Sequence, residues 1–365
     1  MRKLFSLILL LAALLAVSCS TTQGSSVEPY SQPDRQPDPQ PEPVADPQPE
    51  GSIETGDELI IYSGRSEELV GPLIKRFEEV SGVHVGVRYG ETAQMAATIL
   101  EEGQNSPADI FFAQDAGALG ALAAHGRLIP LPDDLLNRVE PRFRSPQGVW
   151  VGTSGRARVV AYNTAHVDPA DLPASIFGFT DPRWRGRIGW VPTNGSFQAF
   201  VTAMRVLEGE ERTRAWLEGI LANKPIAYPS NSVALEAVAA GEVDVAFINH
   251  YYLFQALAEQ GESYGARIYF LPGGDVGALV NVAGVGILDT SDNVEAARQF
   301  VDFLLSEEAQ RYFAERTYEY PLISGVPADP RLPPLEEIQT PEIDLSDLSD
   351  LEGTLRLLQE VGVLE

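Results

Sequence analysis

The sequence predicts an α/β fold in which strands and helices alternate along most of the chain. Three observations support this prediction. Short apolar runs that suit strands alternate with longer amphipathic segments from residue 58 onward. Glycines follow several of the amphipathic segments, at the position where a helix ends. The 365 residues, of which 44% are hydrophobic and 21% charged, are enough for two domains that each have a core.

The first predicted elements show the pattern clearly. Residues 59–62 are a short apolar strand, and Ser66 is the expected N-cap of the helix that follows. That helix ends at Gly82. Its apolar residues recur at helical spacing and share one face, which consists of Leu69, Val70, Leu73, Ile74 and Phe77.

The later elements repeat the alternation. Further strands are predicted at 83–87, 109–112 and 243–248, and further helices at 92–102, 115–125, 233–240 and 251–260. Strands joined by helices form parallel or mixed sheets that helices cover on both faces. The sequence shows no internal repeat of 20–50 residues.

The N-terminal 56 residues follow a different pattern. Residues 1–18 have a basic start and a short apolar run, which is typical of a secretory signal peptide. The run LLAVSC resembles the lipobox of bacterial lipoproteins, with Ala16 in place of the usual leucine, and this resemblance implies cleavage and lipid attachment at Cys19. Residues 19–56 include PDRQPDPQPEPVADPQPEG, whose composition predicts a disordered tether. Cys19 is the only cysteine, so the fold has no intramolecular disulfide.

Charge and missing motifs exclude several function classes. The formal net charge of −26 argues against nucleic-acid binding and against adhesion of the folded surface to an anionic membrane. The sequence has no dinucleotide-binding, Walker, zinc-protease or nucleophile-elbow motif, so a secreted hydrolase is a poor alternative. Four scattered histidines and one cysteine also argue against a zinc site.

Polar residues gather after the predicted strands. They lie at 64–66, 114–115, 193–196 and 249–252. Ligands of open α/β sheets bind beyond the carboxyl ends of the strands, and helix N-termini attract anions there. These groups therefore predict one shared cleft between two lobes.

The pair Tyr251-Tyr252 opens a predicted helix. Two adjacent helical residues point in different directions, so one tyrosine can pack in the core while the other lies at the surface. The alternative is a pair of phenolates that bind a hard trivalent cation. Metal ligands must lose their protons, and a free phenol has a pKa of about 10. Only a strongly Lewis-acidic ion such as Fe(III) would displace these protons near neutral pH.

Most of the predicted folded region resembles the bacterial ferric-iron-binding proteins of the transferrin-like group. These are type 2 periplasmic binding proteins that supply an ABC permease and its ATPase. The resemblance implies a two-lobed fold with a hinge of crossing strands and an interlobe cleft. It places lobe 1 at 57–158 plus 282–332, and lobe 2 at 159–281 plus 333–365. The matching stretches, in the order of the family, are IYSGRSEELVGPLIKRFEEVSGVHV, SPADIFFAQDAGAL, GTSGRARVVAYN, WRGRIGWVPTNGSFQAFVTA, NSVALEAVAAGEVDVAFINHYY, GDVGALV and EYPL.

The resemblance also suggests metal ligands. Tyr251 and Tyr252 match the paired tyrosine ligands of the family. Ser66 stands where some members have a histidine, Gln114 where they have a glutamate, and Phe197 where others have a third tyrosine. These departures leave other ligands to be found, such as an exogenous anion, Glu67 or Asp115. Tyr62 is expected in the strand core.

A synergistic anion, carbonate or phosphate, is implied in the same way. Phosphate-using members cradle it with residues that correspond to Asn194, Gly195, Ser196, Asn231 and Asn249. Carbonate-using members use arginines, and Arg65 and Arg156 are similarly placed. The alternatives are turns and helix caps for the asparagines, and solvated ion pairs for the arginines.

We therefore expect a monomeric solute-binding lipoprotein, not an enzyme, that captures Fe(III) outside the cytoplasm. Its contact with the membrane would be the lipid anchor alone. The alternative is a protein of the same fold for another solute, such as an organic anion, a phosphonate, a polyamine or a different metal. The departures at Ser66 and Gln114 keep this alternative open.

Overall fold

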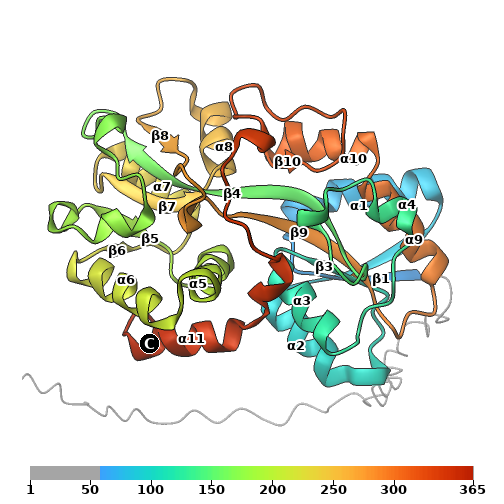
Figure 1. Ribbon diagram of the computed structural model, residues 1–365. Helices are drawn as coiled ribbons and strands as arrows, with labels where there is room; N and C mark the ends of the chain where they lie inside the picture. Colours follow the sequence, from blue (N-terminus) through green and yellow to red (C-terminus); the bar gives the residue numbers. More distant parts are fainter. Residues whose placement is uncertain (1–57, 365) are drawn as a thin grey trace, which may run out of the picture. The chain divides into compact units, whose positions relative to one another are not determined.

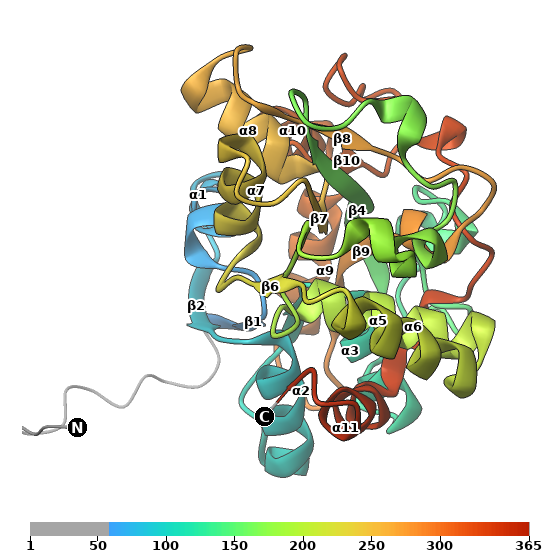
Figure 2. The ribbon, with the colours of Figure 1, turned by 90° about the vertical axis from the view of Figure 1, so that its left-hand side faces the viewer.

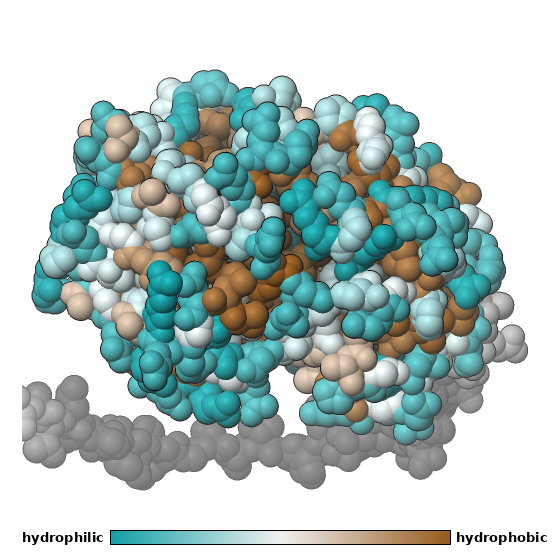
Figure 3. Space-filling model, in the orientation of Figure 1, coloured by the Kyte–Doolittle hydropathy of each residue, from teal (hydrophilic) through white to brown (hydrophobic). Residues whose placement is uncertain are grey.

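The computed structural model describes residues 58–364. The predicted signal peptide, the lipidation site at Cys19 and the predicted tether lie outside these residues. Among residues 58–364, no helix is both long enough and apolar enough to cross a membrane. Polar residues cover most of the face drawn in Figure 3, and apolar residues reach its surface mainly near the middle.

The chain alternates strands and helices, as predicted (Figure 1). The strands are β1 (Glu58–Ser63), β2 (His84–Tyr89), β3 (Ile110–Ala113), β4 (Val151–Asn163), β5 (Ile188–Trp190), β6 (Ile226–Ala227), β7 (Val245–Asn249), β8 (Ala266–Tyr269), β9 (Val280–Ile287) and β10 (Tyr320–Pro321). The helices are α1 (Glu67–Ser81), α2 (Thr92–Glu102), α3 (Ala116–Ala124), α4 (Asp133–Leu136), α5 (Gly195–Glu208), α6 (Glu210–Ala222), α7 (Asn231–Ala240), α8 (Tyr251–Gln260), α9 (Val294–Leu304), α10 (Glu307–Tyr312) and α11 (Leu351–Glu360).

Short helical turns connect these elements. They are η1 (Gly103–Asn105), η2 (Pro141–Phe143), η3 (Pro169–Asp171), η4 (Ile176–Thr180), η5 (Pro182–Trp184), η6 (Val276–Ala278), η7 (Phe313–Thr317), η8 (Leu335–Glu337) and η9 (Leu345–Ser349). The turn η7 is a π-type turn, and Tyr318 directly after it has a φ of 58°. This left-handed conformation is uncommon for a residue other than glycine.

Helix α1 shows why the predicted elements form. Its buried residues share one face, and Phe77 on that face packs edge-on against Phe300 of α9, with ring centroids 5.1 Å apart. The helix ends at Gly82, whose φ of 75° is easily adopted by glycine, and whose N–H donates to the carbonyl of Glu78. Ser66 is the N-cap residue, but its side chain makes no capping hydrogen bond.

The sheet has mixed strand directions and runs in the order β2-β1-β3-β9-β4-β7-β5-β6. Strands β1, β2 and β3 are parallel, whereas β9 runs antiparallel to both β3 and β4. On the other side of β4, β7 pairs antiparallel with β4 and parallel with β5. The mixed α/β class predicted from the sequence is therefore confirmed.

Strand β4 joins the two lobes. Its residues 151–157 pair with β9, and its residues 158–163 pair with β7 or β8. The strand thus leaves one half of the sheet and enters the other (Figure 1). In both ribbon views α7 and α8 lie on the opposite side of β7 from α5 and α6 (Figure 2). The residue ranges predicted for the two lobes stay a prediction.

The C-terminal segment contacts helices from both halves of the sheet. Turn η9 packs against α3 so closely that a Cβ atom on Gly117 would lie 2.4 Å from the carbonyl oxygen of Leu348. Helix α11 packs against α5, where the hydroxyls of Thr354 and Thr202 are 2.7 Å apart. Helix α3 follows β3 and α5 follows β5, so one segment holds a helix from each half of the sheet.

Candidate functional site

The two tyrosines lie at the start of α8, directly after β7. Their ring centroids are 4.3 Å apart, and the ring planes differ by 31°. Tyr251 is 4% exposed, whereas Tyr252 is only partly buried. The two phenols therefore form one stacked pair at the carboxyl end of a strand, where α/β folds place their ligands.

Burial and the neighbouring charges set the protonation of this pair. Burial raises the pKa of Tyr251 well above its ordinary value, and the phenol of Tyr252 acts in the same direction. The guanidinium of Arg156 opposes this shift. The phenol of Tyr251 is thus protonated at neutral pH, and a cation that binds it must displace the proton.

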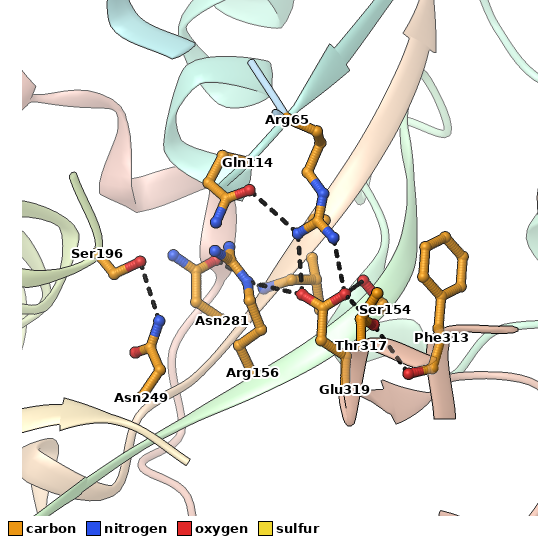
Figure 4. Close-up of polar contacts among 12 residues, drawn as sticks. Arg65, Gln114, Ser154, Arg156, Ser196, Asn249, Asn281, Phe313, Thr317 and Glu319 are labelled. Carbon is orange, nitrogen blue, oxygen red and sulfur yellow. Dashed lines mark hydrogen bonds and ion pairs between the residues drawn. The ribbon is translucent and has the colours of Figure 1, made fainter. Parts of the chain in front are cut away.

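An arginine–glutamate pair lies close enough to the two tyrosines for their phenols to affect the pKa of Arg65. Figure 4 shows this pair, Arg65 and Glu319. Arg65 donates from Nη1 and Nη2 to the two carboxylate oxygens of Glu319, at 2.9 and 2.7 Å. Arg65 Nη1 also donates to Oε1 of Gln114 at 3.0 Å. The hydroxyls of Ser154 and Thr317 donate to Glu319 at 3.2 and 2.9 Å. Burial would raise the pKa of Glu319, but the charge and hydrogen bonds of Arg65 outweigh it and hold that pKa below its ordinary value.

Arg156 is the second buried arginine of the site, and it differs from Arg65. Its side chain is 2% exposed, yet Nε, Nη1 and Nη2 find no hydrogen-bond acceptor among residues 58–364. The carboxylate of Glu319 comes within 3.8 Å of Nε, which is too far for a hydrogen bond. Burial, and next to it the charge of Arg65, lower the pKa of Arg156. A buried cation of this kind is costly unless an anion compensates it.

The polar residues at the start of α5 mostly satisfy one another. Asn194 caps the helix by accepting hydrogen bonds from the backbone N–H groups of Ser196 and Phe197. Asn249 donates to the hydroxyl of Ser196 at 3.2 Å and accepts from Nη1 of Arg158 at 3.1 Å. This chain of hydrogen bonds orders the groups that the resemblance assigned to a phosphate. Gly195 is the first residue of α5.

Asn231, at the start of α7, is an exception. It is 1% exposed, and within the part of the chain that the structure describes neither amide atom of its side chain has a hydrogen-bond partner. A buried amide without partners is unusual in folded proteins. Its two polar atoms therefore remain available to a ligand.

Other candidate residues have structural roles. Tyr62 is buried in β1 and its hydroxyl donates to Glu102 at 3.0 Å, which agrees with the expected place in the strand core. Phe197 is fully buried, with its ring centroid 5.6 Å from that of Trp190. Asp115 caps α3 by accepting from the N–H of Ala118. Ser66 and Glu67 are both exposed.

His250 is a buried residue that the sequence analysis did not single out. Its Nδ1 accepts from the backbone N–H of Ala157 at 3.1 Å, so its Nε2 carries the proton and donates to the carbonyl of Tyr318 at 2.9 Å. Burial lowers its pKa to about 4. Ala157 is the last residue of β4 that pairs with β9, and the next residue pairs with β7. The neutral histidine is therefore hydrogen-bonded to β4 at the point where the strand passes from one half of the sheet to the other.

The donor set restricts what a metal could use here. Within residues 58–364, no group of three or more histidine, cysteine or acidic side chains is placed to hold a metal ion. The phenol pair offers two oxygen ligands, and the guanidinium of Arg156 offers donors for an oxyanion next to them. The arrangement suits a hard cation whose remaining ligands come from a bound anion.

Comparisons with known proteins identify the family of this chain. A family model described as "Bacterial extracellular solute-binding protein" matches residues 105–346. The major ferric iron-binding protein of Neisseria meningitidis serogroup B is 36% identical over 310 residues, which cover 84% of this chain and 93% of the relative.

Solved structures similar to this chain lead to the same family. Iron-bound HitA from Pseudomonas aeruginosa has a TM-score of 0.79 and 38% identity, and the match covers 84% of this chain and 99% of HitA. The Trichodesmium protein IdiA (FutA), solved with iron and citrate ligands, has a TM-score of 0.73 and 29% identity, with 84% of this chain and 99% of that chain covered. The resemblance inferred from the sequence is confirmed, and so is the two-lobed fold. This chain belongs to the ferric-iron-binding group of the bacterial extracellular solute-binding proteins.

Proposed function

We propose that this protein captures Fe(III) with the phenolate oxygens of Tyr251 and Tyr252 and delivers it to an ABC permease and its ATPase. The observation that carries the proposal is the stacked phenol pair, 4.3 Å between ring centroids, beside the buried guanidinium of Arg156. Relatives of known name support the cargo, since they are called ferric iron-binding or were solved with iron.

The coordination shell would be shared between protein and anion. Two phenolates leave most positions of an octahedral ferric ion open, and Gln114 is engaged with Arg65 while Ser66 is exposed. An oxyanion held by Arg156, carbonate or phosphate, would supply further oxygens and charge. Asn231 could hold it from the other lobe. The Trichodesmium relative was solved with iron and citrate ligands, which supports a role for an oxyanion beside the metal.

The chemistry is capture and release. Closure of the lobes about β4 would bury the metal, and the closed form would dock on the permease. Capture expels two phenolic protons, so acid favours release. The protein would act as a monomer, and lipidation at Cys19 would hold it on the outer side of a membrane. Within this scheme the site needs no catalytic residue.

Optical titration tests the proposal. Apoprotein mixed with Fe(III) and bicarbonate should develop a visible phenolate-to-iron charge-transfer band and retain one iron ion per chain. Tyr251→Phe or Tyr252→Phe should weaken the band, and the double substitution should abolish it. Tyr228→Phe is the matched control, because the hydroxyl of Tyr228 donates to Glu242 and has no part in the pair.

A colourless protein that does not retain iron would contradict the proposal. Calorimetry with organic anions, phosphonates, polyamines and other metals would then identify the solute. Arg156 would still favour an anionic solute in that case, because its charge remains to be compensated.

A further inference from the structure

His250 is the whole connection between a central strand and the phenol pair. Strand β7 ends at Asn249 and α8 begins at Tyr251, so no loop separates them. The backbone of His250 is already helical, with a φ of −60° and a ψ of −40°, and its side chain caps no N–H group of α8. The contacts of this one residue therefore determine where α8 starts, and with it the phenol pair.

His250 extends the ladder between β4 and β7 by one residue. The last regular pair of that ladder is Arg158 with Asn249, and Ala157 follows on β4. The N–H of His250 donates to the carbonyl of Ala157 at 3.0 Å, as in an antiparallel ladder. The carbonyl of His250 does not return the bond, because it accepts from the N–H of Leu253 at 3.2 Å in the first turn of α8. Nδ1 of the ring takes its place and accepts from the N–H of Ala157 at 3.1 Å.

The side chain thus replaces a backbone acceptor. Ala157 is fully buried, so without the ring its N–H would be a buried donor in need of a partner. A neutral imidazole has one acceptor nitrogen and one donor nitrogen, and the bond at Nδ1 leaves the donor at Nε2. The strand can therefore end and the helix begin at one residue while the hydrogen bond of β4 is kept.

The donor nitrogen connects α8 to the segment that carries Glu319. Nε2 of His250 donates to the carbonyl of Tyr318 at 2.9 Å, and Glu319, drawn in Figure 4, is the next residue. Tyr318 has a left-handed φ of 58°, a conformation that persists only where surrounding contacts hold it. The ring of His250 also packs against the ring of Tyr320, with centroids 4.8 Å apart. One buried side chain therefore holds the start of α8 against β4 and against this segment.

We propose that His250 is the positioning residue of the phenol pair, which holds the oxygens of Tyr251 and Tyr252 in the geometry that binds the metal. The ring itself does not coordinate, since Nδ1 and Nε2 are both hydrogen-bonded to the backbone. Groups that orient a metal ligand commonly change metal affinity by about 10–100-fold when they are removed. The inference rests on the proposed function for the identity of the metal, but the position of the rings can be tested without iron.

Three substitutions separate the two hydrogen bonds of the ring. Asparagine places Oδ1 where Nδ1 was and keeps the bond from Ala157, glutamine can reach Tyr318 alone, and leucine keeps neither bond. Fe(III) affinity is measured by competition with citrate, and dissociation by transfer of iron to excess chelator. His250→Leu should bind Fe(III) about 10–100-fold more weakly, release it faster and show a shifted charge-transfer band. His250→Asn should stay within about ten-fold of the native affinity, and His250→Gln should lie between the two.

Asn223→Leu is the matched control. Asn223 is buried, and its Nδ2 donates to the carbonyls of Phe179 and Asp181, both at 2.9 Å. The substitution removes two side-chain hydrogen bonds to the backbone, as His250→Leu does, but its partners are not residues of the site. The control should lose stability in urea titrations and keep the native iron affinity, dissociation rate and band.

Near-ultraviolet circular dichroism of the apoprotein tests the position of the rings without iron. The native spectrum minus that of Tyr251→Phe gives the signal of the stacked pair, and the same difference is measured in each His250 variant. The signal should be largely lost in His250→Leu and retained in His250→Asn. If the native protein forms no iron band, the proposed function fails, and this measurement still decides whether His250 positions the rings.

Three results would overturn the inference. In the first, His250→Leu keeps the native affinity, dissociation rate and ring signal. In the second, Asn223→Leu weakens iron binding as much as His250→Leu, so that loss of stability alone explains the effect. In the third, His250→Asn is no better than His250→Leu. If the leucine variant does not fold, the other two decide the question, and equal iron affinity and ring signal in His250→Asn and His250→Gln would contradict the role of the bond to Ala157.

Discussion

Replacing Glu319 by glutamine should strongly destabilise the protein. The carboxylate accepts two hydrogen bonds from Arg65 and one each from Ser154 and Thr317, and it lies 3.8 Å from Nε of Arg156. Glutamine keeps the shape but turns an NH₂ donor toward another donor. It also removes the only full negative charge in contact with the buried guanidinium of Arg65 among residues 58–364.

The expected loss follows from that geometry. Removing one partner of a buried ion pair leaves an uncompensated charge and costs about 3–5 kcal/mol. Domains are commonly stable by about 5–15 kcal/mol, so the free energy of unfolding should fall by about a fifth or more. Urea unfolding of the apoprotein, followed by tryptophan fluorescence in buffer without bicarbonate, measures this change. Added bicarbonate should recover part of the loss, because it would bring a negative charge to the same two arginines.

This reasoning would be refuted if the free energy of unfolding of the Glu319→Gln protein were within about 1 kcal/mol of the native value. The paired variant Arg65→Met, Glu319→Leu is the control. It removes both charges together and fills the space with apolar atoms, so it should be much more stable than Glu319→Gln alone. If the paired variant is just as unstable, packing and not charge explains the loss.

Three further predictions concern the scaffold. Gly117→Ala should lower the free energy of unfolding by about 1–3 kcal/mol in urea titrations, because the new Cβ would lie 2.4 Å from the carbonyl oxygen of Leu348. A variant as stable as the native protein would show that η9 can move away from α3. Phe197→Tyr should lower the free energy of unfolding by about 1–3 kcal/mol, since the ring is buried against Trp190 and the new hydroxyl would lack a partner. It should leave the phenolate-to-iron band unchanged, and a stronger or shifted band would show that this position reaches the metal. Acidification of the apoprotein should lower the free energy of unfolding more steeply than in His250→Gln. The folded-state pKa of His250 is about 4, below the unfolded value of 6.5, so the unfolded chain binds the extra proton between these values and stability is lost as the pH falls through that range, by up to about 3 kcal/mol. The prediction would be contradicted if urea titrations gave the native and His250→Gln proteins the same dependence of the free energy of unfolding on pH.

Local sequence patterns predicted the elements well because local physics determines them. The apolar face of α1 is visible in the spacing of Val70, Leu73 and Phe77, and Gly82 supplies the left-handed residue that ends the helix. Helices α2 and α8 begin and end where their sequences predicted. The capping interaction expected of Ser66 did not form, since its side chain bonds nothing at the helix start.

The polar network of the site could not be foreseen from spacing. Glu319 is separated from Arg65 by 254 positions, and only the folding of β10 onto β4 brings the two together. Asn281 sits in an apolar strand, where nothing in the sequence shows that it faces Arg156. Asn194 illustrates the reverse case, because its helix-capping role was one of the two expected readings. Long-range pairing, which the sequence does not display, determines which buried polar groups find partners.

The C-terminal segment also affects the order in which the molecule assembles. Helices α3 and α5 are synthesised well before η9 and α11, which pack against them. Both halves of the sheet can therefore form before the residues that span them leave the ribosome. Chains still being synthesised therefore have the two helices without the segment that packs against both of them.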